Sequence, residues 1–275
     1  MATYVISDIH GFYYRFQDLL KQVNFNNAED ELYILGDIID RGPHNKEIIE
    51  WAYNRNFNVY FLLGNHEDMM LSVLNSYSEE NFSTCSNICA LHGGYNTYFD
   101  LIKMWPQEKI NDFLNWVREW PMFFDIQVNN KRFVLVHAGL ALNGIRRSDD
   151  YYRYGRKDII DIPEFNPQWA QSLLWIRDTW YYDLQELPCD VIFGHTGTSR
   201  IYKELIWFNE DLTWFNEDFK KEQKQEIKIE GSPNHILHIN NQKHAIDTGR
   251  EIMGILRLDD MVEFYSTVQE EKDNE

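Results

Sequence analysis

Five short polar clusters divide this chain, and four of them come directly after an apolar run with the pattern of a buried strand. In layered α/β proteins, functional side chains collect beyond the carboxyl ends of the strands. The order of the clusters therefore predicts alternating strands and helices, with the chemistry gathered at one edge. The clusters are DIHG at 8–11, GDIIDRG at 36–42, GNHE at 64–67, HAG at 137–139 and GHT at 194–196.

Hydrophobic periodicity places the elements between these clusters, and the expected fold class is α/β. Apolar runs predict strands at 3–7, 31–35, 58–63, 132–136 and 190–193. Apolar positions at helical spacing predict helices at 15–24, 45–54, 67–74, 105–120 and 168–180. Four late runs predict a meander that forms a second, largely antiparallel sheet; they lie at 235–239, 244–246, 252–258 and 262–266.

The length of the chain suits one large domain. Of its 275 residues, 44% are hydrophobic and 15% aromatic, which is enough for a substantial core. We expect a single domain over 1–268, an inserted acidic segment at about 203–232 and a flexible tail at 269–275. The insertion contains the sequence WFNED twice, at 207–211 and 214–218. It is either a lid or docking surface, or a local duplication without a role.

The charge of the chain limits its partners. A formal net charge of −18 argues against binding a nucleic-acid duplex through a basic surface. A phosphorylated substrate remains compatible with this acidity if metal ions supply local positive charge. The N-terminus lacks the pattern of a signal peptide, and no apolar run is long enough to span a membrane, so we expect a cytoplasmic protein without a membrane partner.

The first two clusters carry candidate metal ligands. Asp8 and His10 stand two residues apart after a strand, a spacing that points both side chains to one side of an extended chain. A carboxylate beside an imidazole suits Mn²⁺, Fe or Zn²⁺ better than Ca²⁺. Asp37 has two carboxylate oxygens and could bridge two ions, while Gly36 allows a close approach and Gly42 a tight turn.

The next residues offer a phosphate ligand and a proton donor. Arg41 is a planar donor fork that matches a phosphoryl group. Asn65 could ligate a metal through its amide oxygen, whereas the adjacent His66 points elsewhere and could act as a general acid. Asp40 could hold the other ring nitrogen of His66. The remaining candidate ligands, each directly after a strand, are His137 and His195.

As an ordered set, these motifs resemble the calcineurin-like metallophosphoesterase superfamily. Within it they are most similar to the phosphoprotein phosphatase family, especially the small bacterial and phage serine/threonine phosphatases and the symmetrical diadenosine tetraphosphatases. The His-x-His ending of many phosphodiesterases is missing after His195, which favours the phosphatases. The matching strings are SDIHG at 7–11, GDIIDRGP at 36–43, GNHE at 64–67, HAGL at 137–140, LLWIRD at 173–178, FGHT at 193–196 and IDTG at 246–249.

The resemblance implies a four-layer fold, in which a central two-sheet β-sandwich is flanked by helices, and a site for two divalent metal ions. Mn²⁺ is the expected metal, with Fe or Zn²⁺ as alternatives. The first ion would be held by Asp8, His10 and Asp37, and the second by Asp37, Asn65, His137 and His195. The implied catalytic residues are His66 with its supporting Asp40, and Arg41 and Arg177 on the phosphoryl oxygens. Alternatively, Arg177 lies on a core helix and forms a structural ion pair.

The leading hypothesis is a metal-dependent phosphomonoesterase that hydrolyses phosphoserine and phosphothreonine with a metal-activated hydroxide. The alternative is a symmetrical hydrolase of dinucleoside polyphosphates, in which Tyr13, Tyr14, Trp175 or Tyr181 could stack on a base. A catalytically silent scaffold is a third hypothesis. The expected partner is a phosphorylated protein or a nucleotide, and the sequence does not determine the physiological substrate or the oligomeric state.

Overall fold

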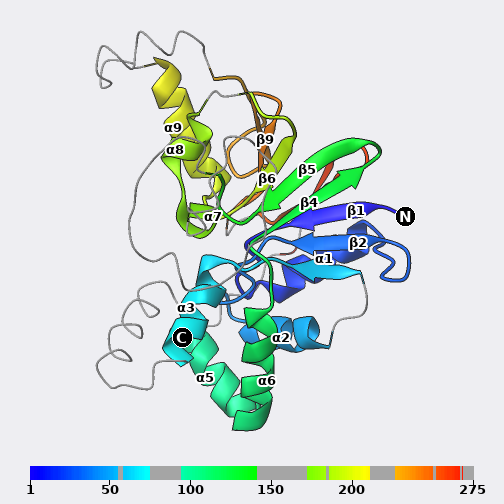
Figure 1. Cartoon of the computed structure of the whole chain (residues 1–275), viewed down its shortest axis with the longest axis vertical. Helices are drawn as coiled ribbons and strands as arrows, with labels where there is room; N and C mark the ends of the chain where they lie inside the picture. The colour runs from blue at the N-terminus through cyan, green and yellow to red at the C-terminus, as the bar shows by residue number, and fades with distance from the viewer. Residues whose placement is uncertain are drawn as a thin grey trace.

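The computed structural model describes residues 1–54, 58–74, 94–140, 172–183, 186–210, 227–249, 252–266 and 268. Two mixed β-sheets pack face to face at the centre of the molecule (Figure 1). The first sheet contains β1 Thr3–Ile6, β2 Glu31–Ile34, β3 Val59–Phe61, β10 Gly254–Arg257 and β11 Val262–Tyr265. The second contains β4 Phe123–Val128, β5 Lys131–Val136, β6 Asp190–Phe193, β7 Ile229–Glu230, β8 Leu237–Ile239 and β9 Lys243–Ala245.

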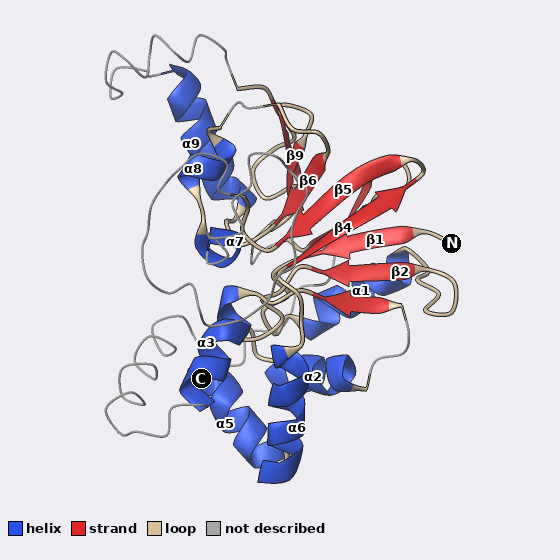
Figure 2. Ribbon diagram, in the orientation of Figure 1, coloured by secondary structure: helices blue, strands red, loops and turns tan. Residues whose placement is uncertain are grey.

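Helices cover both outer faces of the sandwich, which confirms the predicted four-layer α/β fold (Figure 2). On the side of the first sheet lie α1 Tyr13–Gln22, α2 Asn45–Tyr53, α3 Asn65–Leu74, α5 Tyr95–Met104 and α6 Gln107–Arg118. On the side of the second sheet lie α7 Ser172–Trp175, α8 Asp178–Tyr181 and α9 Thr198–Glu210.

The strand order brings the predicted motifs to one edge. The first sheet runs β11-β10-β1-β2-β3, and the second runs β4-β5-β6-β9-β8-β7. Strands β1, β2 and β3 are mutually parallel, and so are β5, β6 and β9. The carboxyl ends of each parallel group therefore share an edge, where the loops that follow them can meet.

Alternating side chains of the central strands build two cores. On β1, Tyr4 and Ile6 face the helices, whereas Val5 faces the other sheet. Phe133 and Ile192 of the second sheet join Val5 between the sheets. A strand that is covered on both faces has a continuous apolar sequence, which explains why these strands could be predicted from the sequence.

The helix predicted at 105–120 shows how the local sequence determines where a helix forms and where it begins. In α6, Ile110, Phe113, Leu114 and Val117 are buried at helical spacing. Pro106 occupies the N-cap position with extended backbone, where the missing N–H costs no helical hydrogen bond. The apolar stripe and the proline therefore act as predicted.

Two expectations about the elements were wrong, and one strand was missed. The four late strands do not form one sheet, because β8 and β9 join the second sheet while β10 pairs with β1 in the first. The helix expected at 168–180 is interrupted between α7 and α8. Strand β4 was not predicted, although it pairs with β5 along its whole length.

Some expectations fall outside the described residues: the tail at 269–275, and positions 211–226 of the inserted segment, which include the second WFNED copy. The first copy continues α9 as far as Glu210. The extent of a single domain over 1–268 stays a prediction. Among the helices that the structure describes, none combines the length and the apolar character needed to cross a membrane.

A histidine pair, of which His244 is buried and His238 partly buried, connects the two sheets. His238 Nδ1 lies 2.6 Å from His244 Nδ1, and each outer Nε2 faces a carboxylate, Glu263 at 2.8 Å and Asp190 at 2.9 Å. Lys131 also pairs with Asp190. Because both Nε2 atoms face carboxylates, the two Nδ1 atoms meet at a distance that leaves room for only one hydrogen, and a hydrogen on each would bring two N–H groups face to face.

We predict that this histidine pair makes the free energy of unfolding fall as the pH is lowered. Burial lowers the pKa of His244 from 6.5, so below that pH the unfolded chain binds a proton that the folded chain resists. His244→Gln should reduce the acid-side loss of unfolding free energy and cost about 2 kcal/mol at neutral pH. Urea unfolding on both sides of pH 6.5 measures this, with His235→Gln as the control. Parallel pH profiles for His244→Gln and the wild type would contradict it.

Candidate metal centre

The loops that follow β1, β2 and β6 are held in unusual backbone conformations. The affected residues all have positive φ: Asp8 at 53°, His10 at 48°, Asp37 at 54°, Asp40 at 73°, Arg41 at 64° and His195 at 65°. Such conformations are uncommon outside glycine and often mark functional sites. Asp8 and His10 do face one site, but through left-handed turns and not through the extended geometry expected from their spacing.

Two glycines allow these loops to approach each other. Gly36 has φ +84°, and a Cβ atom there would lie 2.5 Å from the backbone of Gly64. A Cβ on Gly42 would lie 2.3 Å from the carbonyl oxygen of His10. The close approach predicted for Gly36 is therefore observed, and Gly42 is subject to the same steric limit, because neither position takes a larger residue without moving the backbone. The tight turn expected at Gly42 stays a prediction.

One group of ligand atoms gathers between the first two loops. His10 Nε2 lies 3.6 Å from Asp8 Oδ1 and 3.7 Å from Asp37 Oδ2. His10 Nδ1 donates to the carbonyl oxygen of Ile39 at 2.8 Å, which leaves the Nε2 lone pair facing the two carboxylates.

A second group gathers on the other side of Asp37. His137 Nε2 lies 3.5 Å from Asp37 Oδ2 and 2.9 Å from Asn65 Oδ1, and His195 Nδ1 also lies 2.9 Å from that amide oxygen. His137 Nδ1 donates to the Leu35 carbonyl oxygen at 2.7 Å, so Nε2 of the neutral ring is an acceptor. Acceptor atoms that converge in this way are arranged like the ligands of a cation.

The donor atoms fit two cations bridged by Asp37. Within the described residues, Asp8 Oδ1, His10 Nε2 and Asp37 Oδ2 are buried without a hydrogen-bond partner. Atoms of Asp37, His137 and His195 also lie within 4.8 Å of one another. Nitrogen and oxygen donors of this kind suit Mn²⁺, Fe or Zn²⁺. All six predicted ligands are thus brought together.

Burial sets the protonation state that such a site needs. It lowers the pKa of His10, His137 and His195, and it raises the pKa of Asp37. The imidazoles are therefore neutral at physiological pH, which is the form that ligates metal. A bound cation would favour the ionised form of Asp37 and oppose the effect of burial.

His66 is placed beside the metal ligands and is held by two further residues. Its Nδ1 lies 2.6 Å from Asp40 Oδ2, and the other oxygen of Asp40 accepts a hydrogen bond from Thr97 Oγ1 at 2.5 Å. Its Nε2 lies 3.8 Å from Asp37 Oδ2 and 3.0 Å from a guanidinium nitrogen of Arg41. His66 is thus close enough to the centre to act on a substrate, and geometry does not separate that role from ligation.

The two arginines line one cavity with the metal ligands. The cavity has a volume of about 280 Å³, and both Arg41 and Arg177 face it together with Asp8, His10 and His195. Arg177 lies in the break between α7 and α8, where it donates to Thr196 Oγ1 at 3.0 Å. The alternative of a continuous core helix at 173–178 is therefore wrong, and the break is what places Arg177 at the site.

Sequence reasoning missed a residue that holds the loops together. The buried Glu67 carboxylate accepts hydrogen bonds from the backbone N–H groups of Asp37 at 2.8 Å, Ile38 at 2.9 Å and Gly64 at 3.0 Å. The sequence shows that Glu67 belongs to the GNHE motif, but it does not show which backbone groups the carboxylate binds. Asp247 of IDTG also faces the cavity and had no assigned role.

The comparisons with known proteins agree with this geometry. The family model for calcineurin-like phosphoesterases matches residues 1–236. The chain belongs to this family. A solved structure of a protein serine/threonine phosphatase from Saccharomyces cerevisiae is similar in fold, with a TM-score of 0.55, 14% identity and coverage of 99% of this chain and 82% of that one.

Curated relatives give more specific names. Symmetrical bis(5'-nucleosyl)-tetraphosphatases from Erwinia tasmaniensis and Actinobacillus pleuropneumoniae are 33% identical over 142 residues and 34% identical over 141 residues. Each match covers 51% of this phosphoesterase. The chain spans about half the length of these relatives, 45% and 46% respectively.

We predict that divalent cations stabilise the folded chain through Asp37. A ligand at a hundredfold excess over its dissociation constant adds about 2.7 kcal/mol. Mn²⁺ should therefore raise the melting temperature of the wild type, and metal analysis should find two ions per chain. Asp37→Asn, which keeps the shape but removes the charge, should abolish both effects. The exposed control Asp125→Asn should retain them. An undiminished response in Asp37→Asn would show that the ions bind elsewhere.

Proposed function

We propose that this protein is a two-metal hydrolase that cleaves dinucleoside tetraphosphates symmetrically. The observation that carries the hydrolase is the convergence of metal-ligand atoms on both sides of Asp37, several of them without a hydrogen-bond partner, beside His66 and two arginines. The names of the curated relatives support the nucleotide substrate over a phosphoprotein. This reverses the order of the two hypotheses that the sequence suggested.

The proposed ligands are those named from the sequence. The first ion would be held by Asp8, His10 and Asp37, and the second by Asp37, Asn65, His137 and His195. Two divalent cations bound here would supply a hydroxide nucleophile at neutral pH. The metal identity stays a prediction, with Mn²⁺ first.

The residues of the chain perform the remaining steps. Arg41 and Arg177 face the cavity and would hold the phosphoryl oxygens, whose charge grows in the transition state. His66 would donate its Nε2 proton to the leaving phosphate oxygen as the phosphorus–oxygen bond breaks, while Asp40 holds Nδ1. In the structure Arg41 donates to His66 Nε2. A bound phosphoryl group would take over Arg41, and Nε2 could then carry the proton.

The surroundings of the cavity offer surfaces for a base. Trp175 is 37% exposed, and its ring centroid lies 5.8 Å from that of His195. Phe12 lines the cavity, and Tyr14 is half exposed nearby on α1. Tyr181 is fully buried, so the suggestion that it stacks on a base was wrong. The scaffold hypothesis is disfavoured, because catalytically silent relatives usually lose ligands and all six candidate ligands are present in this chain.

We predict that a substrate panel ranks the nucleotide first. Mn²⁺-loaded protein should cleave diadenosine tetraphosphate to two molecules of ADP, with kcat/KM at least about tenfold above that for a phosphothreonine peptide. Trp175→Ala should lower kcat/KM for the dinucleotide about tenfold, as expected for one lost stacking contact. Trp207→Ala, an exposed tryptophan on α9, is the control.

Chromatography of the products checks the panel. A phosphopeptide rate above the dinucleotide rate would make the protein a phosphatase of phosphoproteins. No turnover of either substrate by metal-loaded protein would revive the scaffold hypothesis.

We predict graded losses along the proton-donor chain. His66→Ala should lower kcat by two to four orders of magnitude without unfolding the protein, as loss of a general acid does. Thr97→Val should lower kcat about tenfold because Asp40 loses a hydrogen bond, and Thr97→Ser should restore most of it. Single-turnover rates and melting temperatures measure both effects. Equal losses for the valine and serine variants would indicate that packing, and not the hydroxyl group, matters at this position.

A further inference from the structure

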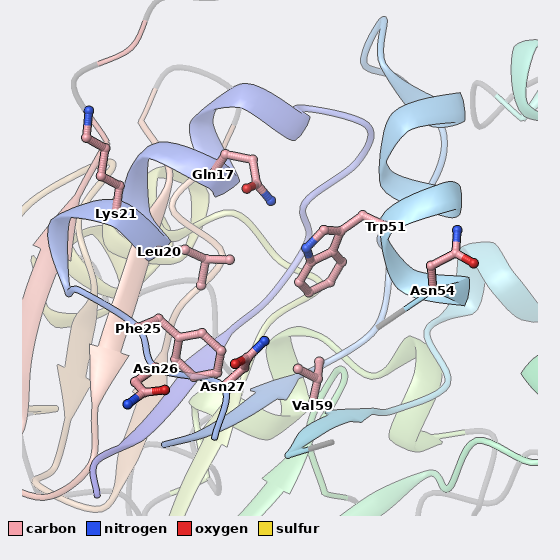
Figure 3. A pocket seen from close by; sticks show the side chains of 9 residues that line it. All are labelled: Gln17, Leu20, Lys21, Phe25, Asn26, Asn27, Trp51, Asn54 and Val59. Carbon is pink, nitrogen blue, oxygen red and sulfur yellow. The ribbon is translucent and has the colours of Figure 1, made fainter. Parts of the chain in front are cut away.

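A second cavity lies at the opposite end of the parallel strands from the metal ligands. It has a volume of about 630 Å³ and opens between α1, α2, the turn after α1 and the first residue of β3 (Figure 3). This volume is within the range of small-molecule sites in proteins. The lining residues are Gln17, Leu20, Lys21, Phe25, Asn26, Asn27, Trp51, Asn54 and Val59.

The apolar part of the lining is suited to a flat ring. Trp51 extends from α2 into the opening, with Leu20 and Phe25 on the facing side (Figure 3). The indole is fixed by edge contacts with Phe16 at 4.6 Å and Phe61 at 6.4 Å between ring centroids. A rigid aromatic side chain that is only partly covered by the protein offers a stacking surface at little entropic cost.

The polar part of the lining consists mostly of amides. Gln17 points into the cavity (Figure 3), and its Nε2 atom is buried without a hydrogen-bond partner among the described residues. Asn54 donates its amide hydrogen to the Glu50 carbonyl oxygen at 2.8 Å, which leaves its Oδ1 as an acceptor. The lining therefore holds an unsatisfied amide donor on α1 and an amide acceptor on α2, and hydrogen-bonding groups of these kinds read the edges of nucleobases.

The charge of the residues that line the cavity further restricts the class of ligand. Lys21 is the one charged residue among the nine that line the cavity, in a chain with net charge −18. None of the described lining residues is a carboxylate, so they do not repel an anion, and the exposed, flexible side chain of Lys21 at the rim can turn to pair with one phosphate. It cannot hold a nucleic-acid strand, which needs several phosphate contacts.

We propose that this cavity binds a purine mononucleotide, with the base between Trp51 and Phe25, its edge on Gln17, and its phosphate near Lys21. The site is separate from the metal centre, and the proposal does not depend on the reaction catalysed there. AMP is the probe, and adenosine tests the contribution of the phosphate.

Isothermal titration calorimetry on the Mn²⁺-loaded Arg41→Ala protein tests the proposal, because that background weakens nucleotide binding at the metal centre. AMP should bind saturably at submillimolar concentration, and adenosine several-fold more weakly. Adding Gln17→Leu should weaken both ligands about tenfold, the cost of one hydrogen bond. Adding Lys21→Glu should lower the affinity for AMP at least fivefold but the affinity for adenosine less than twofold.

Matched controls come from α5 and α6. Lys103→Glu makes the same change of charge, and Gln107→Leu makes the same change of side chain; both positions are exposed and outside the cavity. Neither should alter AMP binding, and melting temperatures confirm that each variant folds. Absence of saturable AMP binding, or binding that Gln17→Leu and Lys21→Glu leave unchanged, would overturn the proposal. Neither result would bear on the hydrolase activity, which the substrate panel measures separately.

Discussion

The buried carboxylate of Glu67 is the interaction on which the arrangement of the site depends. It accepts three backbone N–H groups, two from the loop after β2 and one from the loop after β3. Hydrogen bonds from several backbone donors stabilise an ionised carboxylate, and each would otherwise be an unpaired donor in the interior. Asp37 is fixed by this contact on one side and by the backbone N–H of His66 on the other. Asp37, the proposed bridging ligand, is therefore positioned by backbone contacts of the protein itself.

The unfavourable backbone conformations of these loops are likewise maintained by hydrogen bonds between one loop and another. Positive φ at Asp8 and Asp37 is unfavourable for either residue in isolation, yet their backbones are connected across the site. The N–H of His10 donates to the carbonyl oxygen of Asp37 at 2.9 Å, and that of Gly11 donates to Ile38 at 2.8 Å. The two strained loops thus hold each other, and the cost is met by tertiary contacts as expected for functional sites. Several acceptor atoms of these loops face one another, an arrangement that a positive charge between them would stabilise. The loops are therefore preorganised for cations.

The sequence predicted the strand ends well and the long-range pairings poorly. Strands buried on both faces produce uniform apolar runs, and the polar residues after them mark the site directly. In contrast, nothing in the short late runs shows that β10 should pair with β1, about 250 residues away, while β8 and β9 pair elsewhere. The break before α8 was hidden because 173–178 has good helical composition. The motif therefore pointed to Arg177, which does face the cavity, but the local structure that places it there could be found only from the fold.

In the proposed mechanism, charge links the metals to substrate binding as well as to the attack on phosphorus. The chain carries a net charge of −18, and the site itself contains Asp8, Asp37 and Asp247. Burial, and after it the charge of Asp8, raises the pKa of Asp247 to about 8. Two divalent ions would outweigh the ligand carboxylates and leave Arg41 and Arg177 available for phosphate. An anionic substrate should consequently bind only after the ions, so loss of metal should raise KM as well as lower kcat.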